Sequence, residues 1–306
     1  MAPDAQSAAG ATTQAVALPA QPRRKGRKRS EAGGRLSPLA LGAIYLALGI
    51  GAFIMLIPFI WMIVTSLKPM NEVTVFPPKW IWWPIHWHNY VDAWRTAPFG
   101  RYFFNSIVVA VVSTVLEVIT CAMAAYAFAR MNFFGKNTLF MLLLGSIMVP
   151  GEVLLVPNFI TLVRLSWIDT YWALIIPWIV SVFGIFFMRQ AFLQLPNELF
   201  DAGKIDGCGT FRFLWRVVLP LSKPVVTTVA LFKFIGSWNS FLWVLIVTNT
   251  PNMRTIPVGL TYFSTEVGTT YNLLMAASAF SMLPILVLFF LAQKQFIQGI
   301  ARTGLK

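Results

Sequence analysis

Long apolar stretches separated by short polar segments dominate the chain. Six stretches hold at most one charged side chain each, and each is long enough for the roughly 17–25 residues that cross a bilayer as a helix. Backbone polar groups in hydrocarbon must find partners within their own segment, so each stretch is predicted to be helical. The fold class is therefore an all-α membrane protein with about six transmembrane helices. The predicted spans are residues 36–67, 102–129, 137–163, 170–188, 224–253 and 267–293.

The distribution of charge predicts which side each loop occupies. The net charge is +13, and seven of the 24 Lys and Arg residues cluster just before the first span, a pattern typical of a cytoplasmic flank and not of a nucleic-acid interface. With the N-terminus inside, six spans return the C-terminus inside, and most Lys and Arg residues then lie on the inner side. We expect an N-in/C-in topology, an uncleaved first span and a disordered basic cytoplasmic tail over residues 1–35. The tail's basic residues are Arg23, Arg24, Lys25, Arg27, Lys28, Arg29 and Arg35.

Three charged side chains lie inside the predicted spans, where a charge is costly. Glu117, Glu152 and Lys233 are expected to face the bundle interior or a cavity, as a polar lining or as an ion pair, with Asn239 as a further polar candidate. The alternative is a side chain near a span end that reaches the membrane interface. Glu152 is the favoured interior residue, because the preceding Pro-Gly pair interrupts its helix. Lys233 lies about ten residues into the fifth span, too deep to reach the interface easily.

A charged hairpin, residues 197–224, is predicted between the fourth and fifth spans. Asn197 can cap a first helix, which stops at the turn-forming pair Asp206-Gly207. Thr210 can cap a second, amphipathic helix, and Pro220 is expected to end it because proline disfavours helical geometry in the preceding residue. Gly203 weakens the first helix, which is reasonable where another surface approaches closely.

The residues of the charged hairpin follow a known pattern. They read Asp201-Ala202-Gly203, Gly207, and Val217-Val218-Leu219-Pro220. The hairpin thus resembles the cytoplasmic signature loop of permeases from binding-protein-dependent ABC importers, which reads Glu-Ala-Ala, Gly and Ile-x-Leu-Pro at these places. Asp and Gly stand where Glu and the second Ala are usual, so the carboxylate is shorter here.

The resemblance extends along the chain from residue 36 to its end. Segments on every span are similar to the carbohydrate-uptake, maltose-permease-like branch of that family, although Ser240 stands where Asp often follows Trp-Asn. The resemblance implies an ABC importer type I permease fold for residues 36–306, placed in the bacterial inner membrane. The similar segments are "TSLKP", "GRYFFNS", "AYAFAR", "MVPGEVLLVPNF", "DTYWALIIP", "GSWNSFLW" and "QKQFIQGIARTGLK".

The resemblance also implies partners. A second, homologous permease would complete the pathway, an ATPase dimer would bind on the cytoplasmic side, and an external solute-binding protein would deliver the solute. The first helix of the charged hairpin would sit in a cleft of the ATPase and transmit its closure. The residues that would couple the two are Glu198, Asp201, Ala202, Gly203, Asp206, Gly207, Leu219 and Pro220.

The sequence carries no set of residues for catalysis. A phosphate-binding G-x-x-x-x-G-K-[ST] loop is absent, so ATP and Mg²⁺ are expected on the partner ATPase, and this chain is expected to bind no cofactor. His86 and His88 alone make a poor metal site. The Trp-rich outer segment, residues 68–100, fits either a membrane interface or a docking surface. Alternatives to a sugar importer are a permease for glycerol-3-phosphate or a related phosphodiester, or an ion-coupled secondary transporter.

Overall fold

The computed structural model describes residues 37–81, 83–265 and 268–303 of the chain. It divides into two units, Met1–Met55 and Leu56–Lys306, and the boundary falls within helix α1 (Pro38–Ser66). The predicted basic tail, residues 1–35, lies outside the described residues. The candidate functional residues all belong to the second unit.

Three helices in the described residues are long and apolar enough to cross a membrane unaided. They are α1, α4 (Phe99–Arg130) and α15 (Tyr271–Thr303), the last over its Tyr271–Gln293 portion. These helices coincide with the first, second and sixth predicted spans to within a few residues. The ends of α1 and α4 lie within about three residues of the predicted ones, whereas α15 continues to Thr303, beyond the predicted end at residue 293.

The third and fourth predicted spans are broken helices. Helix α5 (Lys136–Gly145) and the short helix η1 (Ser146–Met148) meet η2 (Gly151–Leu154) and α6 (Leu155–Arg164) at a bend of 92°. Helix α7 (Tyr171–Ile175) and η3 (Ile176–Trp178) meet α8 (Val182–Leu193) at 43°. Pro150 and Pro177 lie at these breaks, where proline removes a backbone donor and clashes with the preceding turn.

The fifth predicted span, 224–253, is wrong as a single helix. Helix α12 (Lys223–Trp238) ends at Asn239, and a separate helix, α13 (Leu242–Val247), follows it. At its other end α12 meets the preceding helical segment, Thr210–Leu221, at an angle of 88°. With each bent pair counted as one span, the described residues contain up to six membrane-crossing elements.

Helix α4 lies at the centre of the second unit, against α8 and α12. Its C-terminal half shares a core with α8, where Ala122, Ala125 and Met188 are fully buried. Its N-terminal half contacts α3 (His88–Thr96), α14 (Ile256–Gly259) and α15, with Phe99 and Ala277 at the centre. Because α4 takes part in both cores, displacement of either end is transmitted to its neighbours.

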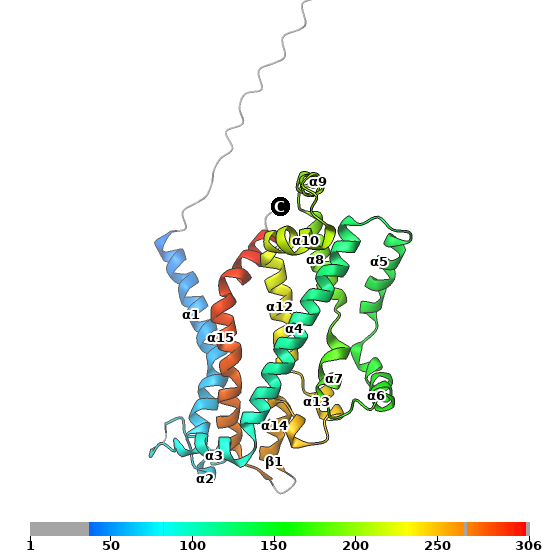
Figure 1. Cartoon of the computed structure of the whole chain (residues 1–306). Coiled ribbons are helices and arrows are strands. Elements are labelled where there is room, and N and C mark those ends of the chain that lie inside the picture. The colour runs from blue at the N-terminus through cyan, green and yellow to red at the C-terminus, as the bar shows by residue number, and fades with distance from the viewer. Residues whose placement is uncertain (1–36, 82, 266–267, 304–306) are drawn as a thin grey trace, which may run out of the picture. The chain divides into compact units, whose positions relative to one another are not determined.

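The end of the second unit opposite the charged hairpin is built from short elements (Figure 1). Helix α2 (Met70–Val73), η5 (Pro251–Met253), η6 (Leu260–Phe263) and a two-stranded antiparallel ribbon, β1 (Ser264–Thr265) and β2 (Gly268–Thr269), join α3 and α14 there. Trp94 of α3 lies edge-on against Phe280 of α15 at 5.6 Å between ring centroids. Trp80, Trp83 and Trp87 are exposed, so the Trp-rich segment presents aromatic surface outward.

Candidate functional site

The charged hairpin folds as two helices joined by a tight turn. Helix α9 (Asn197–Ile205) ends at Asp206, and Gly207 adopts a left-handed backbone conformation with φ of +63°. The amide of Gly207 donates to the Lys204 carbonyl at 3.0 Å, and the amide of Cys208 donates to the Gly203 carbonyl at 2.9 Å. This is a glycine-terminated helix end of the kind that the Asp-Gly pair predicted.

The second helix of the charged hairpin departs from the prediction at both ends. It begins with Thr210 as its first helical residue in α10 (Thr210–Phe213), so Thr210 is not the cap. Pro220 does not end it, because Leu219 keeps helical geometry and the helix continues through α11 (Leu219–Leu221). The turns before the proline, η4 (Leu214–Val218), are π-helical. A wider turn relieves the clash that a proline ring makes with the carbonyl four residues before it.

Gly203 is buried against the second helix of its own hairpin. A Cβ atom at this position would lie 2.4 Å from a carbon of the Phe213 ring, so any larger residue would separate α9 from α10. The close approach predicted at Gly203 is therefore confirmed, and the approaching surface is the Phe213 ring of the second helix of the charged hairpin. Among the other predicted coupling residues Leu219 is half-buried, and the exposed ones are Glu198, Asp201, Ala202, Asp206, Gly207 and Pro220.

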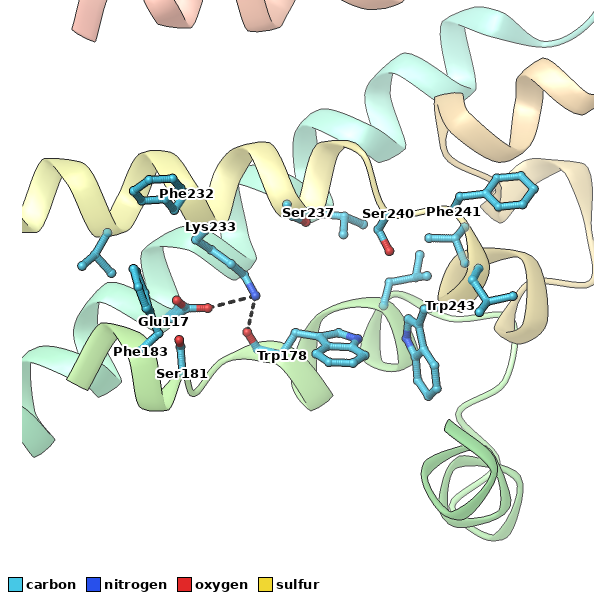
Figure 2. A pocket seen from close by; sticks show the side chains of 16 residues that line it. Glu117, Trp178, Ser181, Phe183, Phe232, Lys233, Ser237, Ser240, Phe241 and Trp243 are labelled. Carbon is cyan, nitrogen blue, oxygen red and sulfur yellow. Dashed lines mark hydrogen bonds and ion pairs between the residues drawn. The ribbon is translucent and has the colours of Figure 1, made fainter. Parts of the chain in front are cut away.

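A cavity of about 520 Å³ lies within the second unit between α4, the break that separates α7 from α8, α12 and α13 (Figure 2). Glu117 and Lys233 point toward each other at its wall, with 3.0 Å between Oε2 and Nζ. Their side chains are only 7% and 12% exposed. Serine and tryptophan side chains supply the other polar and aromatic lining, namely Ser181, Ser237, Ser240, Trp178 and Trp243.

The break between α7 and α8 leaves backbone carbonyls that a continuous helix would have used. Side chains from neighbouring helices donate to three of them. Lys233 Nζ donates to the Trp178 carbonyl, Thr120 Oγ1 to that of Ile179, and Cys121 Sγ to that of Ser181 at 3.4 Å. A broken helix at membrane depth requires such donors, because hydrocarbon offers none.

Comparison with known proteins identifies the family of this chain. A family profile described as "Binding-protein-dependent transport system inner membrane component" matches residues 117–302. The chain belongs to this family. It is a multi-pass membrane permease, and the family's description makes its transport dependent on a binding protein.

Relatives of this permease match it over most of their own length. The arabinooligosaccharides transport system permease protein AraQ of Halalkalibacterium halodurans is 33% identical over 279 residues, which is 89% of this chain and 99% of that protein. The sn-glycerol-3-phosphate transport system permease protein UgpE of Yersinia enterocolitica is 32% identical over 264 residues, covering 84% and 94%. A bacterial transporter that imports the acidic polysaccharide alginate contains a chain of the same fold, with a TM-score of 0.74, 21% identity and coverage of 83% and 95%.

Two predicted interior residues of the permease lie elsewhere. Glu152 is exposed in η2, because the 92° bend carries it out of the α5 axis and away from the cavity. Asn239 is also exposed, and its side-chain amide donates to the Ile235 carbonyl at 3.0 Å, within its own helix. The neighbouring Ser240 lines the cavity instead.

Asn197 was expected to cap α9, but its side chain is engaged by another helix. Pro196 precedes α9, and Asn197 Oδ1 accepts a hydrogen bond from Arg130 Nη1 at 2.6 Å. Arg130 is the last residue of α4. It was not among the functional residues predicted from the sequence. It lies in the "AYAFAR" segment, whose terminal arginine could have been noticed as a basic residue at a helix C-terminus.

Proposed function

We propose that this permease is the membrane subunit of an ATP-driven importer of sugars or oligosaccharides, and that its charged hairpin couples it to a separate ATPase. One observation carries the proposal. In a member of this family, an exposed helix with Glu198, Asp201 and Ala202 on its surface ends at a left-handed Gly207, at the place of the signature loop. A short, rigid, charged helix of this kind suits insertion into a cleft on a partner.

The partners follow from that role. A second, homologous permease would form the other half of the pathway, and an ATPase dimer would bind the charged hairpins of both. ATP and Mg²⁺ would be held by the ATPase, since this chain supplies no phosphate-binding loop. A solute-binding protein would dock at the opposite side; the solved alginate importer in complex with its alginate-bound periplasmic protein is an example of such a partner.

The proposed orientation places both termini and the charged hairpin in the cytoplasm. It rests on the excess of Lys and Arg in the segments that would be inside. The end that carries α3, α14 and the Trp-rich segment would then face outward, where the solute-binding protein docks. ATPase closure would move the charged hairpin, and the attached helices α8 and α12 would reorient with it.

A neutral, hydroxyl-rich solute fits the cavity better than a phosphate does. The charged residues that line it, Glu117 and Lys233, neutralise each other, and the Trp178 carbonyl takes a further donor position of Lys233. A phosphate requires a cation that is available to it. The similarity to UgpE supports glycerol-3-phosphate as the second candidate.

The test is uptake by the reconstituted complex of both permeases, the ATPase and the solute-binding protein in liposomes. Labelled arabinotriose, maltotriose and glycerol-3-phosphate are supplied with and without internal ATP. ATP-dependent uptake of an oligosaccharide supports the proposal, and uptake of glycerol-3-phosphate alone supports the second candidate. Uptake that follows an imposed ion gradient without ATP would overturn both in favour of a secondary transporter.

A further inference from the structure

The charged hairpin is joined by the chain itself to α8 and α12, but α4 has no such connection. Helix α4 nevertheless ends beside α8 and α9 (Figure 1), and its last residue, Arg130, contacts both. Arg130 therefore connects the C-terminal end of α4 to the C-terminal end of α8 and to the N-terminal end of α9.

Arg130 occupies the place of a cap on α8. Its Nη2 donates to the carbonyls of Phe192 at 2.7 Å and Leu195 at 2.5 Å, and its Nε donates to Phe192 at 3.2 Å. The last carbonyls of a helix have no partners within it, and a cation beside them is favoured by the helix dipole. The guanidinium therefore stabilises the end of α8 with several donors in one rigid plane.

The same guanidinium holds the first turn of α9. Nη1 donates to Asn197 Oδ1 at 2.6 Å, and the guanidinium carbon lies 4.0 Å from the centre of the Phe200 ring. Phe200 in turn contacts Phe213 at 5.1 Å and Tyr126 of α4 at 6.4 Å between ring centroids. Because Asn197 is used in this way, the position of the α9 N-terminus depends on α4 and not on a cap of its own.

We propose that Arg130 is the positioning residue that makes α4 follow the charged hairpin, an inference that rests on the coupling role proposed above. Helix α4 carries Glu117 at the cavity wall, about 20 Å from Arg130 at 1.5 Å per residue along the helix. Movement of α9 thus reaches the Glu117–Lys233 pair directly along α4. The coupling path then runs through the second span as well as through the two spans that adjoin the charged hairpin.

Arg189 offers a matched control. It belongs to α8, its Nε donates to the Phe128 carbonyl at 3.2 Å, and its guanidinium carbon lies 4.1 Å from the Phe140 ring centre. Like Arg130, Arg189 combines a hydrogen bond to a backbone carbonyl with a contact to an aromatic ring, but it joins α8 to α4 and α5 rather than to α9. Loss of either arginine weakens helix packing, but only loss of Arg130 removes a hydrogen bond between α4 and α9, where the Tyr126–Phe200 ring contact remains.

The first experiment compares Arg130→Gln, Arg130→Lys and Arg189→Gln in the reconstituted complex. We expect Arg130→Gln to lower the amount of solute imported per ATP hydrolysed about tenfold, because it removes charge-assisted hydrogen bonds that neutral donors replace poorly. Lysine keeps the charge without the planar fork and should recover part of the ratio. Arg189→Gln should keep the ratio, even where less complex assembles. An unchanged ratio in Arg130→Gln would overturn the inference.

The second experiment measures the motion with spin labels on the full complex, in a background without native cysteines that retains uptake. One pair joins Ile205→Cys on α9, an exposed residue outside the predicted coupling set, to Met123→Cys on α4, and a reference pair joins Ile205→Cys to Phe187→Cys on α8. In the wild-type complex both distances should stay the same with and without ATP and vanadate. In Arg130→Gln the α9–α4 distance should broaden and change with nucleotide, while the reference distance stays fixed.

Two results would contradict the inference about Arg130 and leave the proposed function of the permease unaffected. One is an α9–α4 distance that already changes with nucleotide in the wild-type complex, and the other is one that stays fixed in Arg130→Gln. Failure of the proposed function has a different signature. In that case Asp201→Lys, on the exposed face of α9, would leave uptake and ATP hydrolysis normal whatever Arg130 does.

Discussion

Replacement of Lys233 by leucine tests whether the Glu117–Lys233 pair holds the permease together or serves the solute. Both side chains are almost fully buried, with 3.0 Å between Nζ and Oε2. Leucine would leave the Glu117 carboxylate without its cation and the Trp178 carbonyl without its donor. Breaking a buried pair by removal of one partner costs about 3–5 kcal/mol.

The expected result is a large loss of assembled complex from Lys233→Leu. The measurement is the amount and the melting temperature of the detergent-solubilised complex, followed by size-exclusion chromatography after heating. Glu117→Leu combined with Lys233→Leu should recover most of the loss, because an apolar pair of similar volume can replace a buried ion pair at little cost. Lys233→Arg should recover part of it by keeping the charge.

The outcome separates structure from transport. A structural pair gives strong non-additivity in the double-mutant cycle, and uptake falls only in proportion to the complex that remains. A pair that serves the solute leaves assembly intact in Lys233→Leu and lowers uptake per complex. If Lys233→Leu changes neither assembly nor uptake, the assignment of this pair to either role is refuted.

Three further predictions concern the charged hairpin and the topology. Asp201→Lys should abolish uptake and substrate-stimulated ATP hydrolysis while the permease still inserts, because a cation would replace the exposed carboxylate that we propose contacts the ATPase. Normal stimulated hydrolysis would contradict this. Gly207→Val should cost about 1–2 kcal/mol or more at its positive φ and weaken co-purification of the ATPase, whereas Gly207→Asn should be tolerated. A cysteine at Ile85 should react with an impermeant thiol reagent on intact cells and one at Thr210 only after lysis; the reverse pattern would invert the topology.

Local chemistry made part of the structure predictable. Gly207 follows Asp206, and few other residues accept the left-handed geometry that ends a helix, so the turn could be placed from the sequence. The Glu117–Lys233 contact was one of the alternatives open to a buried lysine, because an isolated charge in a span is costly. Glu152 met the same criterion but does not line this cavity, since it lies exposed beside the 92° bend.

The breaks and the role of Arg130 could not be derived in the same way. A run of apolar residues indicates that the segment favours lipid. It does not indicate whether the backbone of that segment forms one continuous helix. Pro177 allows a break, but the donors that make the break tolerable, Thr120 and Lys233, lie 59 and 55 residues from their acceptors. Arg130 and Asn197 are 67 residues apart. Asparagine commonly caps the helix that it precedes, so the sequence does not indicate that the Asn197 side-chain oxygen accepts a hydrogen bond from Arg130 instead.

These distant contacts constrain how the permease can move. A break in a span resembles a hinge, yet the carbonyls at the α7–α8 break are held by side chains of α4 and α12. Bending there would break these three hydrogen bonds and take the Lys233 donor away from the Trp178 carbonyl. Helices α4, α8 and α12 are therefore expected to move as one body, joined at the cavity by Glu117 and Lys233 and at the charged hairpin by Arg130. Rigid-body rotation of this group is the motion that the contacts favour.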